Sequence, residues 1–249
     1  MTFLKKQSIK QTASKTADHS VSNNQITEGV IWKQLLIFFF PILFGTFFQQ
    51  LYNTVDAIIV GRFVGKQALA AVGGPTGTVI NLLIGFFVGL SSGATVIISQ
   101  YYGAKREEMV GYAVHTAITA SVISGAVLMV IGFVGAPFAL NAMGTPEDIV
   151  GFATLYMRIY FLGTIANLIY NIGSGILRAV GDSKRPLYFL IASCFANIIL
   201  DIVFVVYFHM GIAGAALATI ISQFASAILC LILLSKSPED YRVHFRKIR

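Results

Sequence analysis

The chain has 249 residues and a formal net charge of +7, yet only 12% of its residues are charged and 56% are hydrophobic. Its mean hydropathy is +0.76. A soluble domain carries about 25% charged residues, so this composition excludes an ordinary soluble protein and predicts that lipid surrounds much of the chain. Two cysteines, Cys194 and Cys230, lie inside apolar runs, and a disulfide framework or a metal site would need more partners.

The first thirty residues differ from everything that follows. They are rich in Lys, Ser, Thr and Gln, and no apolar run of signal-peptide type occurs before Ile31. Such a segment cannot bury enough apolar surface to fold. We predict a disordered cytoplasmic tail over residues 1–30.

Long stretches with few or no charged residues mark the membrane spans that follow the tail. A helix needs about 20 apolar residues to cross a bilayer, and the stretches lack the alternation typical of barrel strands. The sequence therefore predicts an all-α integral membrane protein with a six-helix lobe over residues 31–236 and a cytoplasmic tail over 237–249. The stretches cover residues 34–60, 67–104, 109–146, 149–177, 186–208 and 213–234.

Short connections carry turn chemistry. Thr145 is expected to cap the helix that begins at Pro146, because Thr favours the N-cap and Pro the first helical position. A polar turn is expected over residues 181–186, and His209, Met210 and Gly211 should close a tight hairpin. No linker divides the chain, which predicts a single domain.

Basic residues are distributed unevenly between the two sides of this topology. Fifteen of the 18 Lys and Arg residues fall in the tails and in the loops after spans two and four, whereas Arg62 and Lys66 alone lie on the opposite side. The positive-inside rule then places both termini in the cytoplasm. The same asymmetry explains the net charge without a nucleic-acid partner. The remaining base, Arg158, is expected to be an interfacial residue on the outer half of span four.

Two acidic residues, Asp56 and Asp201, lie within spans. An acid at the centre of a membrane helix costs about 2.5–3.5 kcal/mol and marks a functional site by default. Glycines 85, 89 and 93, by contrast, form a doubled GxxxG pattern that is typical of helix packing.

Neither aspartate stands alone, because four spans each carry a polar stripe at helical spacing. Four such stripes imply a shared polar interior, although interhelical hydrogen bonding is an alternative explanation for the neutral residues. The stripes comprise Thr46, Gln49, Asn53 and Asp56; Tyr160, Thr164, Asn167, Asn171 and Ser174; Ser193, Asn197 and Asp201; and Thr219, Ser222, Gln223 and Ser226. Pro41, in the middle of the first span, removes a backbone hydrogen bond and is a candidate hinge.

Several local motifs together resemble the MATE (multidrug and toxic compound extrusion) family. Residues 55–61 with 68–73 resemble the signature of its first hairpin, and residues 100–105 resemble the end of its second helix. Residues 177–186 resemble its loop between helices four and five, and Asn197 with Asp201 resembles the Asn-x-x-x-Asp of helix five in one prokaryotic branch. The resemblance runs from about Trp32 to the C-terminus.

This resemblance implies a twelve-helix antiporter of two six-helix lobes in a prokaryotic plasma membrane, which exports cationic amphipathic drugs in exchange for H⁺ or Na⁺. It implies no enzyme activity and no cofactor beyond the coupling ion. By position, it assigns bending to Pro41, ion coupling to Asp56, Asn197, Asp201 and Thr219, and polar contacts in helix four to Tyr156 and Asn171. Together with the stripes, the expected substrate cavity contains Gln49, Asn53, Tyr156, Tyr160, Asn167 and Asn171.

Alternatives remain open at this point. The chain resembles one lobe, so we expect transport to need a second six-helix lobe or a homodimer partner, and a non-transporting truncated fragment is a further alternative. A flippase for lipid-linked sugars from the same superfamily would be expected to line its cavity with several cations, where the spans offer only Arg158. An intramembrane aspartyl protease would need a Gly-x-Gly-Asp motif, which residues 179–182 lack.

Overall fold

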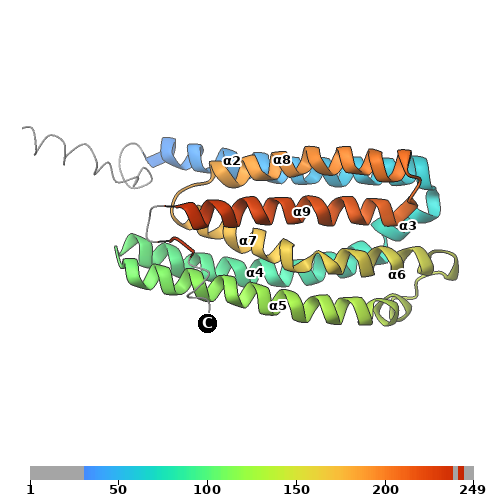
Figure 1. Ribbon diagram of the computed structural model, residues 1–249, viewed down its shortest axis with the longest axis horizontal. Coiled ribbons are helices and arrows are strands. Elements are labelled where there is room, and N and C mark those ends of the chain that lie inside the picture. Colours follow the sequence, from blue (N-terminus) through green and yellow to red (C-terminus); the bar gives the residue numbers. More distant parts are fainter. Residues whose placement is uncertain (1–30, 238–240, 244–249) are drawn as a thin grey trace, which may run out of the picture.

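The structure is a computed structural model that describes residues 31–237 and 241–243, apart from the side chains of three of them; the predicted tail over residues 1–30 lies outside this part. Long helices run along one axis and form a single bundle (Figure 1). In chain order, the segments are α2 (Ile31–Ile59), η1 (Val60–Val64), α3 (Lys66–Gly73), α4 (Pro75–Gly103), α5 (Glu107–Ala142), α6 (Glu147–Leu162), α7 (Thr164–Ala179), α8 (Lys184–Asp201), η2 (Ile202–Tyr207) and α9 (Gly211–Lys236).

Six membrane crossings are consistent with these helices, as the sequence predicted. Five helical stretches are long and apolar enough to cross by themselves, and α6 with α7 makes the sixth as a pair bent by 50°. This pair covers the predicted fourth span, and its helix breaks at Gly163, which no sequence signal predicted. A side chain at Gly163 would collide with Ile220 of α9, so glycine is what permits α7 and α9 to approach here.

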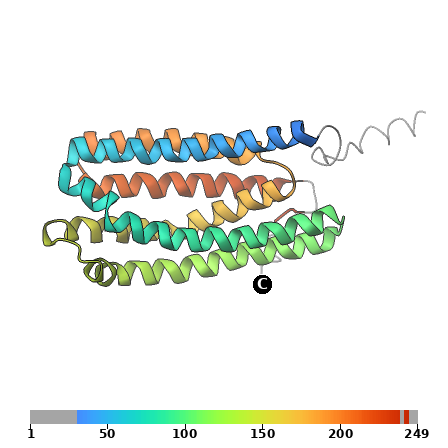
Figure 2. The ribbon, with the colours of Figure 1, turned by 180° about the vertical axis from the view of Figure 1, so that it is seen from behind.

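The helices are arranged in layers. Helices α2 and α8 lie side by side along one edge, α9 follows, and α6 with α7 separates α9 from α4 and α5 (Figures 1 and 2). Helix α9 contacts α6, α7 and α8, so its buried residues form the centre of the bundle. Helices α2, α7, α8 and α9 therefore surround one common space.

Two helices change their winding near the same end of the bundle. Helix α2 passes directly into the π-helical segment η1, and α8 passes into the π-helical segment η2. The two π segments contact each other. Wider π turns are rare and frequently occur at functional sites. No sequence signal predicted them.

The connections partly match expectation. The hairpin forms at His209, whose φ is 54°, and Gly211, whose φ is 60°. The N-cap prediction for Thr145 is wrong: Pro146 precedes α6, and the Thr145 hydroxyl donates to the carbonyl of Leu140, 2.7 Å away, where it satisfies the end of α5. Asp182 in the polar turn accepts bonds from the backbone N–H groups of Lys184 and Arg185 at the start of α8.

Two glycines allow close packing between helices, and neither belongs to the predicted GxxxG pattern. A side chain at Gly132 of α5 would overlap the ring of Phe161 on α6, and one at Gly173 of α7 would collide with Cys230 of α9. Glycines 85, 89 and 93 of α4 have no such neighbour within 4 Å, so their stripe is not packed against another described helix.

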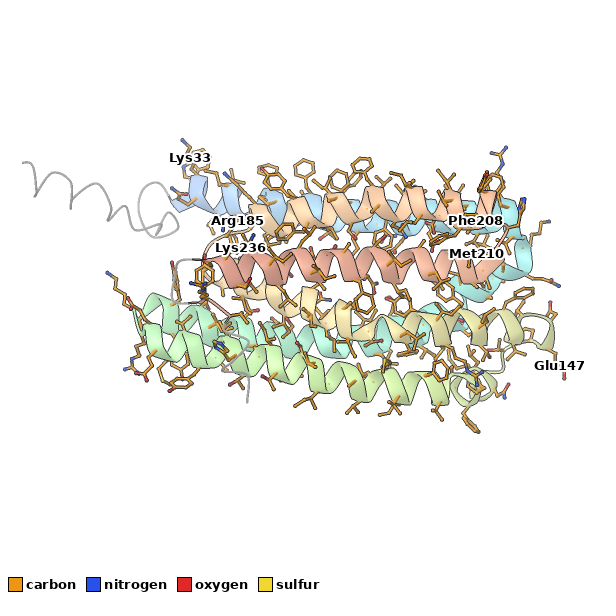
Figure 3. The ribbon with its side chains drawn as sticks, viewed as in Figure 1. Lys33, Glu147, Arg185, Phe208, Met210 and Lys236 are labelled. Carbon is orange, nitrogen blue, oxygen red and sulfur yellow. The ribbon has the colours of Figure 1, made fainter. Side chains whose placement is uncertain are left out.

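The two ends of the bundle differ in charge. Lys33, Arg185 and Lys236 gather at one end, whereas Glu147, Phe208 and Met210 lie at the other (Figure 3). The first is the predicted cytoplasmic end. There the described part of the predicted tail turns back, because the Val243 N–H donates to the carbonyl of Leu234 and the side chains of Tyr241 and Val243 are buried.

We predict that both termini are cytoplasmic. A reporter fused after Arg249 should behave as cytoplasmic, and one fused at Gly144 as external, because the basic residues stay inside. Paired alkaline phosphatase and fluorescent-protein fusions measure this. A cytoplasmic Gly144 junction would contradict the topology.

Gly132→Val should destabilise the bundle, since the added side chain has no room beside Phe161. Overpacking typically costs about 1–3 kcal/mol. Gly135→Val is the matched control on the same helix, because a side chain there meets nothing within 4 Å. Thermal unfolding in detergent should show a lower midpoint for Gly132→Val alone. Equal midpoints for the two variants would show that α5 and α6 do not pack as described.

Candidate functional site

A polar cavity of about 140 Å³ lies between α2, α7, α8 and α9. Gln49, Asn167, Asn171, Asn197 and Thr219 of the predicted site all line it, as do Thr46, Ser174, Ser193, Ser222, Gln223 and Ser226 of the predicted stripes. The polar interior expected from four stripes is therefore present, because helical spacing brings each stripe to the same space.

Helix α7 contributes the wall nearest the predicted cytoplasmic end. Asn167, Asn171 and Ser174 recur at helical spacing, so they share one face. The Asn171 amide donates to the Asn167 carbonyl at 2.8 Å and to the Asn167 side-chain oxygen at 2.9 Å. These bonds hold two amides in fixed positions on the cavity wall.

The acids lie just beyond the cavity lining. Asp56 is 5% exposed and Asp201 is 0% exposed. Tyr52 and Asn197, which do line the cavity, stand four residues before Asp56 and Asp201 respectively, one helical turn toward the cavity. Asp201 immediately precedes η2, and Asp56 lies one helical turn before η1.

The oxygen atoms of this buried acid pair lack hydrogen-bond partners. Oδ1 of Asp56 and both carboxyl oxygens of Asp201 are unpaired among the described residues. The two carboxylates are close enough to repel each other when both are charged. A buried charge without partners is strongly unfavourable, so two ionised carboxylates are disfavoured in this arrangement.

Two neighbouring residues carry further polar oxygen atoms. Asn197 is 2% exposed, and neither its side-chain oxygen nor its nitrogen has a partner among the described residues. The Thr219 hydroxyl donates to the carbonyl of Ala215 at 3.1 Å, which leaves its lone pairs free to accept or to bind a cation. Carboxylate, amide and hydroxyl oxygens are the ligands that hard cations prefer.

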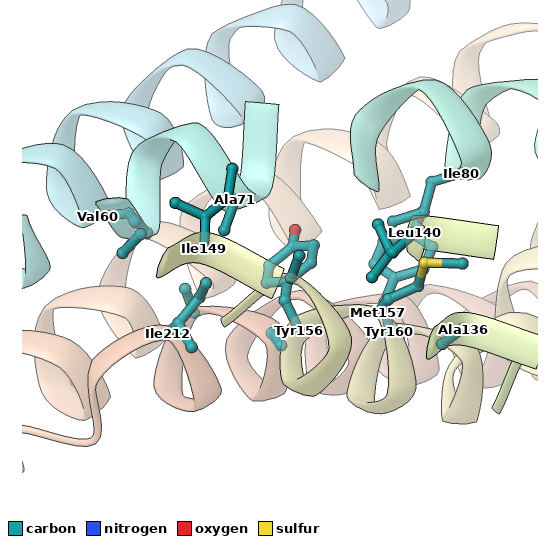
Figure 4. Packing of buried hydrophobic residues seen from close by; sticks show 14 of the residues in the cluster. Val60, Ala71, Ile80, Ala136, Leu140, Ile149, Tyr156, Met157, Tyr160 and Ile212 are labelled. Carbon is teal, nitrogen blue, oxygen red and sulfur yellow. The ribbon is translucent and has the colours of Figure 1, made fainter. Parts of the chain in front are cut away.

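Three residues of the expected cavity lie elsewhere. Asn53 is exposed and does not line the cavity. Tyr156 and Tyr160 stack on each other with ring centroids 6.1 Å apart and belong to the buried apolar cluster around Met157 (Figure 4). Tyr160 nevertheless lies close to Asn167, because the two residues line a smaller void together with Thr164.

The two arginines of the fourth span lie in different settings. Arg158, expected to be an interfacial residue, lies over the Phe133 ring at 5.5 Å, donates to the Phe133 carbonyl at 3.3 Å and does not line the cavity. Arg178, expected in a cytoplasmic loop, belongs to the last turn of α7 and lines the cavity.

Other lining residues carried no usable sequence signal. Tyr52, Tyr170 and Pro186 line the cavity, and the Tyr170 hydroxyl donates to the Pro186 carbonyl at 3.0 Å. A tyrosine within an apolar span is equally consistent with a position in the packed core, so the sequence does not mark it as a cavity residue. Pro41 also lines the cavity, and α2 continues through it as one helix.

The bent fourth crossing, the polar cavity and the buried acids define a polytopic membrane protein with a polar interior. A family model described as MatE matches residues 41–203. The chain belongs to the MATE family.

Similar proteins extend the match. The chain is 36% identical over 210 residues to the probable multidrug resistance protein YoeA of Bacillus subtilis, covering 83% of this chain and 45% of that protein. It is 23% identical over 216 residues to the multidrug export protein MepA of Staphylococcus aureus, covering 87% and 48%. The chain thus spans about half the length of these curated relatives.

Solved structures give the same picture. A MOP superfamily transporter from Pyrococcus furiosus, described as having a binding pocket of reverse polarity, superimposes with a TM-score of 0.83 at 27% identity, covering 90% of this chain and 50% of that one. A crystal structure of a MATE protein in the bent conformation gives a TM-score of 0.80 at 27% identity, covering 87% and 48%. The six-helix fold is therefore that of one part of these transporters.

Water should reach Asn171 but not the apolar core. In a background with Cys194→Ala and Cys230→Ala, Asn171→Cys should react with a charged, water-soluble thiol reagent, because Asn171 lines the cavity. Ala136→Cys is the control, since Ala136 is fully buried in the apolar cluster. Mass spectrometry after timed labelling should show at least about tenfold faster modification at position 171, because the core is packed too densely to admit the reagent. Equal rates would mean that the cavity is closed to water.

Proposed function

We propose that this chain is one lobe of a secondary active multidrug transporter, which exports cationic amphipathic compounds in exchange for H⁺ or Na⁺. The observation that carries the proposal is the fully buried Asp201, whose two carboxyl oxygens have no partner among the described residues. An acid in this setting is a functional site by default.

Ion coupling would take place at the acid pair. A proton bound by Asp56 or Asp201 removes one buried charge and relieves the repulsion between them. Na⁺ could be bound by the same carboxylates together with Asn197 and Thr219. In either form the ion neutralises the end of the cavity that would otherwise attract a cationic drug, so ion and drug would compete.

Movement of α2 would link that competition to transport. Pro41 has no N–H to donate to the preceding turn, which makes it the natural point for α2 to bend. It lines the cavity, so a bend there would reshape the drug site. Structures of a MATE protein are described in bent and in straight conformations, which supports two states of this fold.

A second lobe would complete the transporter, either a separate six-helix chain or a second copy of this one. The relatives are about twice as long as the matched region. The unpacked glycine stripe of α4, at positions 85, 89 and 93, offers close helix approach to such a partner. We place the assembly in a prokaryotic plasma membrane, in contact with lipid and small cationic substrates.

Replacing either acid should abolish coupling. In proteoliposomes that contain the chain with its second lobe, or its homodimer, Asp56→Asn and Asp201→Asn should each lower ion-driven uptake of a fluorescent cationic dye by more than about tenfold. Asparagine cannot take up or release a proton, and it carries no charge for Na⁺. Asn197→Ala and Thr219→Ala should have smaller effects.

The matched control is Asp148→Asn, which removes an exposed acid at the start of α6. It should leave dye transport unchanged, and all variants should insert normally. Uphill dye transport by both Asp56→Asn and Asp201→Asn under an imposed ion gradient would reject the site and leave the aspartates a packing role.

A further inference from the structure

Arg178 turns into the protein rather than out to the cytoplasm. It sits in the last turn of α7, and its Nη2 donates at 3.3 Å to the hydroxyl of Ser174, one turn toward the middle of the bundle. Side chains on a helix lean toward its N-terminus, and the N-terminus of α7 lies deep in the bundle. An arginine at a membrane boundary ordinarily extends to water, so the inward direction is a feature to explain.

No acid among the described residues neutralises this guanidinium. The nearby acid Asp182 pairs instead with Arg185, at 3.1 Å. The Ser174 hydroxyl is the one side chain bonded to Arg178 in the described part of the chain, and that bond is long. Most of its five N–H donors therefore remain available on the cavity side.

Hydroxyl groups continue along the cavity wall beyond Arg178. Ser226 of α9, which is 3% exposed, and Ser222, which is 2% exposed, line the same cavity. Neither hydroxyl oxygen has a hydrogen-bond partner among the described residues. Cys230, one turn after Ser226, lies against Gly173 of α7, so both serines lie deeper in the cavity than Arg178. The polar group at the cytoplasmic end that suits an oxyanion is therefore the Arg178 guanidinium itself.

The positive group and the acids are too far apart to pair. The bond from the Ser193 hydroxyl to the Ser222 carbonyl fixes the register of α8 against α9 and places Asn197 level with Thr219. From Thr219 to Cys230, α9 rises roughly 16 Å at about 1.5 Å per residue. Asp201 lies a further turn away. The cavity consequently has a negative end and a positive end.

We propose that Arg178, held in place by Ser174, forms an anion subsite at the predicted cytoplasmic end of the cavity, and that it binds the carboxylate of a zwitterionic amphipathic substrate. A guanidinium binds a carboxylate through two parallel N–H donors, which gives both affinity and direction. The cationic part of such a molecule would point toward the acids. This proposal rests on the proposed transport function and refines its substrate class.

A matched pair of dyes tests the subsite. Rhodamine 110 is a zwitterion with a free carboxylate, and rhodamine 123 is its cationic methyl ester, so the two differ only in the group that Arg178 would bind. With the full chain in nanodiscs, fluorescence polarisation should show rhodamine 110 binding about tenfold more tightly than the ester, the size expected of a hydrogen-bonded charge pair. Arg178→Gln should remove this preference, and Arg178→Lys should retain part of it.

Arg185→Gln is the control, because it removes a positive charge at the same end of the bundle but outside the cavity lining. It should keep the preference. If Arg178→Gln does not fold, as judged by helical circular dichroism, competition on the unmodified chain replaces it: sodium benzoate should displace rhodamine 110 and spare the ester.

Three results would count against the proposal. Equal binding of the two dyes to the unmodified chain, or an undiminished preference in Arg178→Gln, would overturn the subsite and leave the transport proposal standing. Binding of neither dye would reject the drug site itself, and the subsite with it.

Discussion

Carboxylates within a membrane span have to be kept from lipid, and the arrangement of the bundle follows from that constraint. Asp56 and Asp201 come from α2 and α8, which lie side by side, and both are buried. Their shielding requires α9 and α7 to close the other sides of the same space. Large apolar side chains such as Phe40 and Phe44 are accordingly left on the exposed side of α2, where lipid is an acceptable neighbour.

Backbone irregularities gather around this polar space. The bend at Gly163 and the π segments η1 and η2 interrupt helices that are otherwise regular. A break within the bilayer leaves backbone groups that must be satisfied inside the protein. The bend brings the amides of α7 to the cavity while α6 stays in the apolar core. The segment η2 follows Asp201 directly, and η1 begins one turn after Asp56.

The polarity of the cavity bears on which molecules the family fold can carry here. A site lined only by acids and aromatic rings would select cations. Arg178 adds a positive group at the other end, so the same cavity offers complementary contacts to a molecule that carries both charges. A flippase for lipid-linked sugars would be expected to have several cations in its cavity, but Arg158 lies against Phe133 and, of the described residues, only Arg178 contributes a positive charge to the lining.

Composition and spacing determined much of this protein. Runs of apolar residues fixed the helical class and the six crossings, because lipid admits no exposed backbone, and two acids inside such runs marked the site. The helical spacing that placed Asn167, Asn171 and Ser174 on one face was visible in the sequence.

Tertiary structure alone decided the rest. Asn53 shares that periodicity yet faces outward, because α2 packs chiefly on α8 and only part of its polar stripe turns toward the cavity. Tyr160 stays next to Thr164 and Asn167 of its stripe but packs in the apolar core instead of lining the polar cavity. Arg178 reaches inward because its side chain leans along α7 toward the bundle. Each outcome depends on which neighbour occupies the adjacent space, and helical spacing within one segment carries no information about that neighbour.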